Sequence, residues 1–168
     1  MVAIKKILLM SLLAIFLSTS TSFAKSSVVR IGDWNIMKVE KDGHKQCTAY
    51  AKPFRTKGST FDRQKPYAVV EYRGVKSYSF GVSPGYNIDA TKGVILKIDN
   101  KSRLLDIKLA GNAWTFSANQ DVNLMNDMMK NQKFMEIRSY DGNDNTTVDY
   151  YSLKGLVNVV NYFDARCS

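Results

Sequence analysis

Residues 133–153 read KFMEIRSYDGNDNTTVDYYSL, and this stretch has the pattern of a β-hairpin. Two runs rich in β-branched and aromatic residues, 133–140 and 146–153, flank the turn-forming residues 141–145. Such runs bounded by Gly, Asn and Asp are typical of paired strands. The Asp141-Gly142 step favours a tight turn whose two central residues have positive φ. The sequence therefore predicts an antiparallel hairpin here.

The same pattern recurs toward the N-terminus. An apolar run at 94–98 is followed by a turn at 99–102, after which Leu105, Ile107 and Leu109 alternate with polar residues. This period of two is typical of half-buried strands. Further strands are predicted at 31–39, 46–51, 67–73, 75–82 and 113–117. Residues 53–66, with a proline at each end, are predicted to form a long exposed loop.

Two segments have the period of a helix. Met125 and Met129 fall on one face of 119–131, with Asn119 as the expected N-cap. This Met-rich helix is compatible with a binding or membrane-surface role, but we expect it to pack on a sheet. The second helix carries apolar residues at i, i+3, i+4 and i+7, namely Leu156, Val159, Val160 and Phe163. We therefore expect an all-β, mainly antiparallel fold, a β-sandwich or partly closed barrel of about eight or nine strands with two short helices.

The N-terminus has the composition of a secretion signal. Lys5 and Lys6 precede the apolar run 7–17, and Ser22-Phe23-Ala24 supplies the small residues of a cleavage site. The run is too short to span a bilayer, which needs about 20 apolar residues. We predict that residues 1–24 are a signal peptide cleaved after Ala24. Residues 25–168 would then form a single periplasmic or secreted β-sandwich domain with no transmembrane span.

Positive charge is concentrated in the first third of the predicted mature chain. Without Lys5 and Lys6, 22 basic residues stand against 15 acidic ones. Residues 25–76 hold 12 basic and five acidic residues, whereas 77–168 hold ten of each. The densest cations lie in and beside the predicted long loop: Lys52, Arg55, Lys57, Arg63 and Lys65. They are either a solvated loop or a surface for an anionic partner, such as lipid head groups, lipopolysaccharide, acidic glycans or an acidic protein. Nucleic acid is not expected as a partner of an exported protein.

Only two cysteines, Cys47 and Cys167, belong to the predicted mature chain. An even pair in an oxidising compartment usually bonds, which predicts a bridge from the penultimate residue to an early strand. The bridge would close a loop of about 120 residues and stabilise the fold by about 5 kcal/mol in the chain-entropy model. The alternative is a reactive thiol activated by His44, the only histidine. We favour the bridge, because His44 lies in a predicted turn.

The sequence contains no recognisable catalytic or cofactor motif. It has no nucleophile elbow, phosphate-binding loop, dinucleotide fingerprint or C-x-x-C pair. The best metal candidate is a calcium loop formed by Asp141, Asn143, Asn145 and Asp149. A plain turn is the simpler interpretation, because Thr146 stands where an EF-hand requires glycine. The three glutamates, Glu40, Glu71 and Glu136, leave a hydrolytic carboxylate pair open in principle. We expect no enzyme activity and no cofactor.

Short motifs in a characteristic order support a family resemblance. In chain order they are Gly32-Asp33-Trp34, a lone Cys47, FGVSPGYNI at 80–88, KGVILKID at 92–99 and YSLKGL at 151–156. Together they resemble the invasion-associated locus B family of exported alphaproteobacterial proteins. Members of that family typically have further cysteines in the region of 114–130, and this sequence has none there. The resemblance implies a secreted or periplasmic β-sandwich linked to host-cell invasion or to the envelope, and it supplies no catalytic residues.

These observations favour a non-enzymatic binding protein of the envelope. Its basic loop would contact an unidentified protein or an anionic envelope or host surface, and a role in invasion follows only from the resemblance. A periplasmic chaperone or enzyme-inhibitor module is the alternative, since inhibitors also present rigid, disulfide-stapled loops. A hydrolase with an unrecognised carboxylate pair is the third hypothesis.

Overall fold

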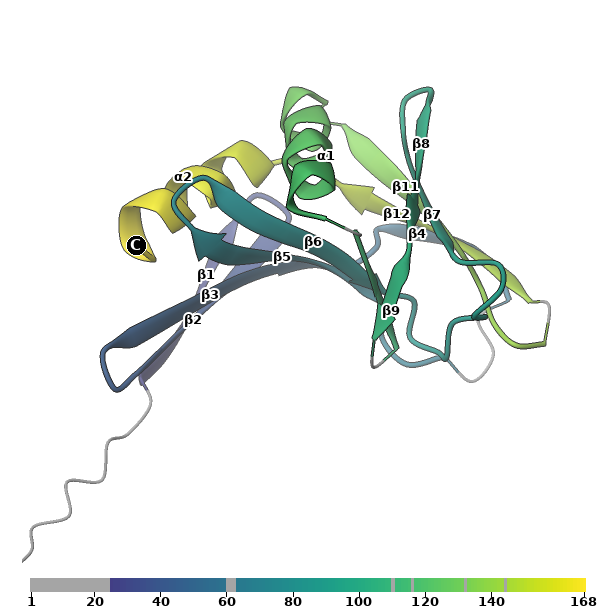
Figure 1. Cartoon of the computed structure of the whole chain (residues 1–168), viewed down its shortest axis with the longest axis horizontal. Coiled ribbons are helices and arrows are strands. Elements are labelled where there is room, and N and C mark those ends of the chain that lie inside the picture. The colour runs from purple at the N-terminus through teal and green to yellow at the C-terminus, as the bar shows by residue number, and fades with distance from the viewer. Residues whose placement is uncertain (1–24, 60–62, 110, 116, 132, 144) are drawn as a thin grey trace, which may run out of the picture.

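Two antiparallel sheets and two helices enclose the core of the protein (Figure 1). The computed structural model describes residues 25–59, 63–109, 111–115, 117–131, 133–143 and 145–168. In spatial order, the larger sheet contains β1 (Lys25–Ile31), β2 (Trp34–Lys41), β3 (His44–Ala51), β5 (Tyr67–Gly74), β6 (Ser77–Ser83), β10 (Asn112–Trp114) and β9 (Ile107–Leu109). The smaller sheet contains β4 (Arg55–Gly58), β12 (Thr146–Ser152), β11 (Phe134–Tyr140), β7 (Val94–Ile98) and β8 (Lys101–Leu105). The helices are α1 (Ala118–Lys130) and α2 (Leu156–Arg166).

The predicted fold class is confirmed, although the described residues form twelve strands rather than eight or nine. The predicted strand 31–39 is β2, and the chain turns at Gly32 and Asp33 before it, after an additional strand, β1, that was not predicted. The predicted loop 53–66 contains β4. β1 and β4 are edge strands with few buried residues, so they lack the apolar alternation by which a strand is recognised. The predicted alternating run that ends at Leu109 is divided between β8 and β9, which belong to different sheets.

The predicted hairpin at 133–153 is β11 and β12, with Phe134 opposite Ser152 and Tyr140 opposite Thr146. The expected turn geometry at Gly142 is wrong, because its φ is not positive. A tight turn with two positive φ values lies instead between β2 and β3, at Asp42 (53°) and Gly43 (77°). The loop after β11 has five residues, so it does not need the two-residue geometry.

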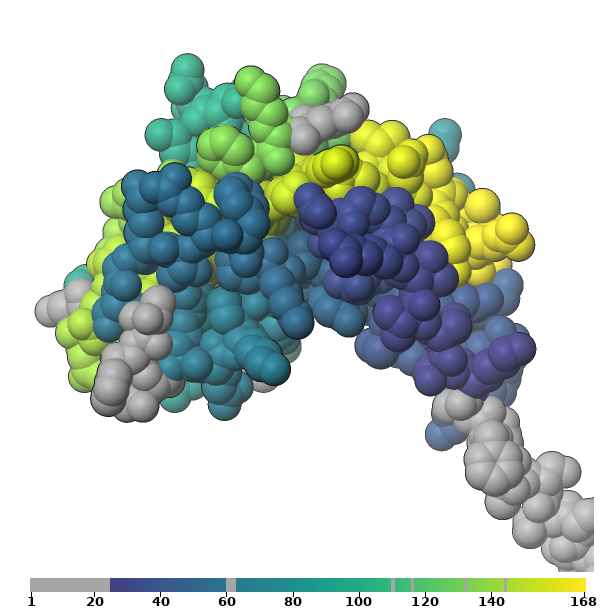
Figure 2. All heavy atoms as spheres, turned by 180° about the vertical axis from the view of Figure 1, so that it is seen from behind, coloured from purple at the N-terminus to yellow at the C-terminus, as the bar shows by residue number. Residues whose placement is uncertain are grey.

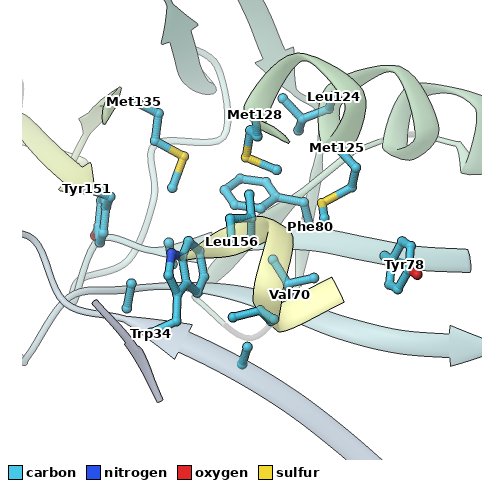
Figure 3. Close-up of a cluster of buried hydrophobic side chains, with 14 of the residues drawn as sticks. Trp34, Val70, Tyr78, Phe80, Leu124, Met125, Met128, Met135, Tyr151 and Leu156 are labelled. Atoms are coloured by element: carbon cyan, nitrogen blue, oxygen red, sulfur yellow. The ribbon is translucent and has the colours of Figure 1, made fainter. Parts of the chain in front are cut away.

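The helices cover the inner face of the larger sheet. Figure 3 shows Met125 and Met128 of α1 pointing toward Phe80 of β6, as expected for a helix packed on a sheet. Ser117, not Asn119, is the N-cap: its Oγ accepts from the backbone N–H of Gln120 at 3.4 Å. None of the helices in the described residues is long and apolar enough to cross a membrane.

Asp121 in the first turn of α1 has a tertiary role. Its buried Oδ1 accepts hydrogen bonds from the backbone N–H of Phe80 at 2.9 Å and from the Thr115 hydroxyl at 2.5 Å. A buried carboxylate without such partners would be costly. Asp121 therefore fixes α1 to β6 as well as suiting the start of a helix.

The predicted disulfide is present and joins Cys47 of β3 to Cys167 at the end of α2. Their Cα atoms are 6.1 Å apart, and both residues are buried. The reactive-thiol hypothesis therefore fails, because the sulfur is bonded and His44 is exposed. The predicted signal peptide, residues 1–24, lies outside the described residues.

Two of the motifs behind the family resemblance meet in the fold. The backbone N–H of Asp33 donates to the carbonyl of Lys154 at 3.2 Å. Gly32 has a φ of 60°, and a Cβ there would lie 2.4 Å from that same carbonyl oxygen. A Cβ on Gly155 would lie 2.8 Å from the carbonyl oxygen of Ile31. The two motifs thus provide close backbone packing between the first hairpin and the start of α2.

Candidate functional site: a basic and aromatic surface

The predicted basic loop becomes an edge of the smaller sheet. β4 pairs with β12, and Arg55 lies opposite Tyr150 while Lys57 lies opposite Val148. Opposed residues of an antiparallel pair project from the same face, so both cations point outward with Tyr150. The Arg55 guanidinium carbon is 5.2 Å from the centre of the Tyr150 ring, and Lys57 Nζ is 5.8 Å from it. These are cation–π distances, which hold the two charges over an exposed face of the sheet.

Three aromatic rings form a cluster beside these cations. The ring centres of Phe54 and Phe134 are 6.4 Å apart. The ring centre of Tyr150 lies 6.4 Å from that of Phe54 and 5.9 Å from that of Phe134. Phe54 is 61% exposed and Phe134 is 45% exposed. Exposed aromatic residues gathered in one place mark interaction surfaces more often than isolated ones do.

A cavity of about 700 Å³ adjoins the aromatic cluster and is lined in part by Phe54 and Phe134. Three cations, Arg30, Lys52 and Lys133, also line it, and Asp33 is the only acidic residue among the described residues that line it. Asp33 is 4.0 Å from Arg30. We call the combined feature the basic–aromatic surface: Lys52, Phe54, Arg55, Lys57, Lys133, Phe134 and Tyr150. Figure 2 shows the blue residues around β4 on the outside of the molecule, beside the yellow-green of β12.

Arg63, which was predicted to belong to the contact surface, is a buried structural residue. Its side chain is only 4% exposed and forms a bidentate ion pair with the fully buried Asp149 of β12. Arg63 Nη1 lies 3.1 Å from Asp149 Oδ1, and Arg63 Nε donates to the carbonyl of Pro84. Thr56 of β4 donates its hydroxyl to the same Asp149 oxygen at 2.6 Å. Arg63 therefore connects β12, β4 and the segment after β6, and it positions the surface without being part of it.

Lys65 shares a pocket with Lys52, Thr56 and Arg63, but Arg55 and Lys57 do not line that pocket. Together with Lys52, Lys65 lines a different groove, on the outward face of the larger sheet. Of the five predicted cations, the structure thus brings Lys52, Arg55 and Lys57 to the basic–aromatic surface.

Sequence reasoning missed Lys133, Phe134 and Tyr150 as members of this surface. A signal for the two aromatic residues was present, because Phe134 and Tyr150 occupy outward positions of a hairpin whose inward positions are Met135 and Tyr151. Their closeness to β4 is not predictable from the sequence, because the polar, exposed β4 segment has the pattern of a loop. The neighbouring Tyr151 points into the core instead, where burial strongly raises the pKa of its hydroxyl and keeps it neutral.

The described residues do not support the calcium hypothesis. Asp149 is buried against Arg63, whereas Asp141 accepts hydrogen bonds from the backbone N–H groups of Asn143 and Asn145, at 2.8 Å and 2.9 Å. No group of three or more His, Cys, Asp or Glu side chains in the described part of the chain is placed to hold a metal ion. The three glutamates each lie beside a cation of their own strand: Lys38, Arg73 and Arg138.

The hydrogen bonds that Asp141 accepts from Asn143 and Asn145 are expected to weaken at acidic pH. The hydrogen bond from the Asn145 side chain, followed by backbone N–H donors, lowers the pKa of the Asp141 carboxyl. A lowered folded-state pKa stabilises the loop above about pH 4 and loses that effect as the pH falls through the lowered pKa. We expect the amide NMR signals of Asn143 and Asn145 to move together below pH 4, and the Asp141→Asn variant to lack this transition. A transition of unchanged midpoint in the variant would contradict the assignment.

No protein-family model matches the sequence, and no curated protein matches it. Among solved structures, the crystal structure of invasion associated protein b from Bartonella henselae matches with a TM-score of 0.57. The match covers 83% of this chain and 96% of that chain, with 15% sequence identity. The two proteins share a fold. The likeness agrees with the resemblance indicated by the sequence motifs, and it covers most of the chain.

Proposed function

We propose that this chain is an exported, non-enzymatic protein of the cell envelope that binds an anionic lipid surface through its basic–aromatic surface. The observation that carries the proposal is the stacking of Arg55 and Lys57 on Tyr150, next to the exposed Phe54 and Phe134. Aromatic rings favour the interface between lipid head groups and acyl chains, and Arg and Lys attract anionic head groups. One face of the smaller sheet therefore offers both kinds of contact.

Export is supported by two features. The first is the signal-like sequence at 1–24, and the second is the disulfide between Cys47 and Cys167, which persists in oxidising compartments. The fold shared with invasion associated protein b supports an association with invasion. The absence of a recognisable catalytic motif in the sequence supports binding over catalysis.

The test is co-sedimentation with lipid vesicles. We expect the protein to bind vesicles containing phosphatidylglycerol, to bind pure phosphatidylcholine weakly, and to lose affinity at high salt. Each Lys or Arg near an anionic surface contributes about 1 kcal/mol, so the Arg55→Glu, Lys57→Glu variant is expected to bind at least about tenfold more weakly. Lipopolysaccharide in place of phosphatidylglycerol tests whether the partner is a bacterial outer leaflet.

A matched control has the same net charge and lies elsewhere. Lys41 and Lys45 are exposed residues at the turn between β2 and β3, and the Lys41→Glu, Lys45→Glu variant lowers the net charge equally. If both double variants lose the same affinity, net charge and not the basic–aromatic surface drives binding. If neither loses affinity, the proposed surface is wrong.

The open edge of the larger sheet favours a second candidate, a chaperone or inhibitor module. β1 is an edge strand with six exposed residues and pairs through only one side, with β2. Such an edge can accept an extended segment of another protein by strand addition. Capture from envelope extract distinguishes the two, because an inhibitor is expected to recover one enzyme at equal stoichiometry, and to lose it when Val28 is replaced by proline.

A further inference from the structure

The outward face of the larger sheet contains a groove of about 480 Å³. In Figure 1 the sheet bends like an arch, with both helices above it, and Figure 2 shows the lower outline of the molecule hollowed on the side away from the helices. Cross-strand register places Tyr50 opposite Val69, Val69 opposite Gly81 and Gly81 opposite Trp114. These four residues therefore form one row across the floor of the arch.

The floor of the groove is apolar. Val69 points away from the core, yet it is only 6% exposed because the groove's larger side chains surround it. Trp114 lies on Gly81, where a Cβ would meet the indole ring at 2.5 Å. Met37 and Tyr67, both on the groove wall, add exposed apolar surface. A solvent-facing sheet is usually polar, so this face has the composition of a binding site.

The two ends of the groove differ in charge. Lys52 follows the end of β3 and Lys65 precedes the start of β5, so both cations lie at one end. Neither forms an ion pair with a residue that the structure describes. Glu71, in ion contact with Arg73, lies toward the other end of β5. At about 3.3 Å per residue, the wall strand from Gln46 to Lys52 is about 20 Å long.

We propose that this groove binds an amphiphile with a single alkyl chain and an anionic head, such as a long-chain carboxylate. The chain would lie along β3 and β5 over Val69 and Trp114, and the head would lie between Lys52 and Lys65. A pocket with a mostly apolar lining and a few charged groups at one end both binds and orients such a ligand. Glu71 disfavours the reversed orientation.

Shape argues against a second copy of the chain as the occupant. Two identical concave faces would touch only at their rims and bury little surface area. An alkyl chain, by contrast, can fill the groove of a single copy. The groove shares Lys52 with the basic–aromatic surface but is otherwise built from different residues. Trp114 is not part of the basic–aromatic surface, and Arg55 and Lys57 do not line the groove, so the Trp114 signal and the Arg55→Glu, Lys57→Glu variant test the two proposals separately.

The experiment compares three probes with the same alkyl chain, dodecanoate, dodecanol and dodecyltrimethylammonium, each below its micelle concentration. The readout is the pair of tryptophan indole N–H signals in a proton NMR spectrum, assigned with the Trp114→Phe variant. We expect dodecanoate to shift the Trp114 signal and to leave that of the fully buried Trp34 in place. Dodecanol is expected to bind about fivefold more weakly, and the cationic probe weaker still.

The Lys52→Gln, Lys65→Gln variant tests the head site. Both residues are exposed, so the fold is expected to persist, and dodecanoate affinity is expected to fall about fivefold to the level of dodecanol. The Lys97→Gln variant, at an exposed site on β7, is the control and is expected to bind normally. Tyr50→Ala removes part of the groove floor and is expected to weaken the binding of all three probes.

Three results would overturn the proposal. The first is the absence of any dodecanoate-dependent shift of the Trp114 signal. The second is equal binding of the anionic and cationic probes. The third is a Trp114 signal that changes with protein concentration alone, which would make this face a self-association surface.

Discussion

Replacing Arg63 with alanine is expected to lower the free energy of unfolding by about 3–5 kcal/mol, the usual cost of removing one partner of a buried ion pair. The substitution leaves the carboxylate of Asp149 fully buried, and among the described residues only the Thr56 hydroxyl still donates a hydrogen bond to it. It also removes the donor to the Pro84 carbonyl and the cation above the Tyr86 ring, 5.7 Å from its centre. Because this network ties the smaller sheet to the segment that follows β6 of the larger sheet, we expect the loss to affect the whole fold.

Urea unfolding followed by circular dichroism measures the effect. The control is Arg55→Ala, an exposed cation eight residues earlier, which is expected to cost less than about 1 kcal/mol. Replacing both partners, as in the Arg63→Met, Asp149→Leu variant, removes the unpaired charge and is expected to recover most of the stability. A loss below 1 kcal/mol in Arg63→Ala would show that Arg63 is not the buried anchor described above.

Removing the disulfide has the second large effect. The Cys47→Ala, Cys167→Ala variant is expected to lose about 3–5 kcal/mol of stability, because the bridge constrains a loop spanning 120 residues in the unfolded chain. The loss is expected to be visible locally as well. Cys167 holds the last turn of α2 against β3, so amide hydrogen exchange in this turn is expected to accelerate most.

Thermal unfolding with and without a reducing agent provides the measurement. We expect reduction to lower the melting temperature of the wild-type protein and to leave that of the double variant unchanged. Both cysteines are buried, so reduction of the disulfide in the native protein is expected to be slow until the end of α2 separates from β3. Native protein in which both thiols react freely with a thiol reagent would contradict the bridge.

The sequence predicted the features that local pattern controls. The hairpin at 133–153, the helical face of Leu156 and Phe163, and the bridge between Cys47 and Cys167 all agree with the structure. The hairpin follows from apolar–polar alternation and the helix from the period of its apolar residues, and both patterns are visible within a short stretch of sequence. The bridge follows from the number of cysteines.

The features that were missed depend on contacts between distant segments. Arg63 was grouped with its exposed neighbours because nothing near it in the chain reveals Asp149, which is 86 positions away. β4 has an exposed polar sequence and becomes a strand only through pairing with β12. Trp114 was expected in a strand, but its place on Gly81 follows from strand order, which the sequence does not display.

The basic–aromatic surface likewise has one part that the sequence predicts and one part that only the fold reveals. The sequence indicated the charge of the basic–aromatic surface, because net charge and its clustering are additive along the chain. It did not indicate that Phe134 and Tyr150 complete the surface from a hairpin about 90 residues later. The aromatic half gives the surface its suitability for a lipid interface, and only the fold brings the two halves together.

Amide chemical-shift mapping on anionic lipid nanodiscs tests the proposed binding role most directly. With uniformly labelled protein, we expect the strongest broadening or shifts at β4, at Tyr150 of β12 and at Phe134 of β11, and we expect these changes to vanish at high salt or in the Arg55→Glu, Lys57→Glu variant. Neutral nanodiscs serve as the reference. The largest changes at α2 or β8, with β4 unaffected, would contradict the account.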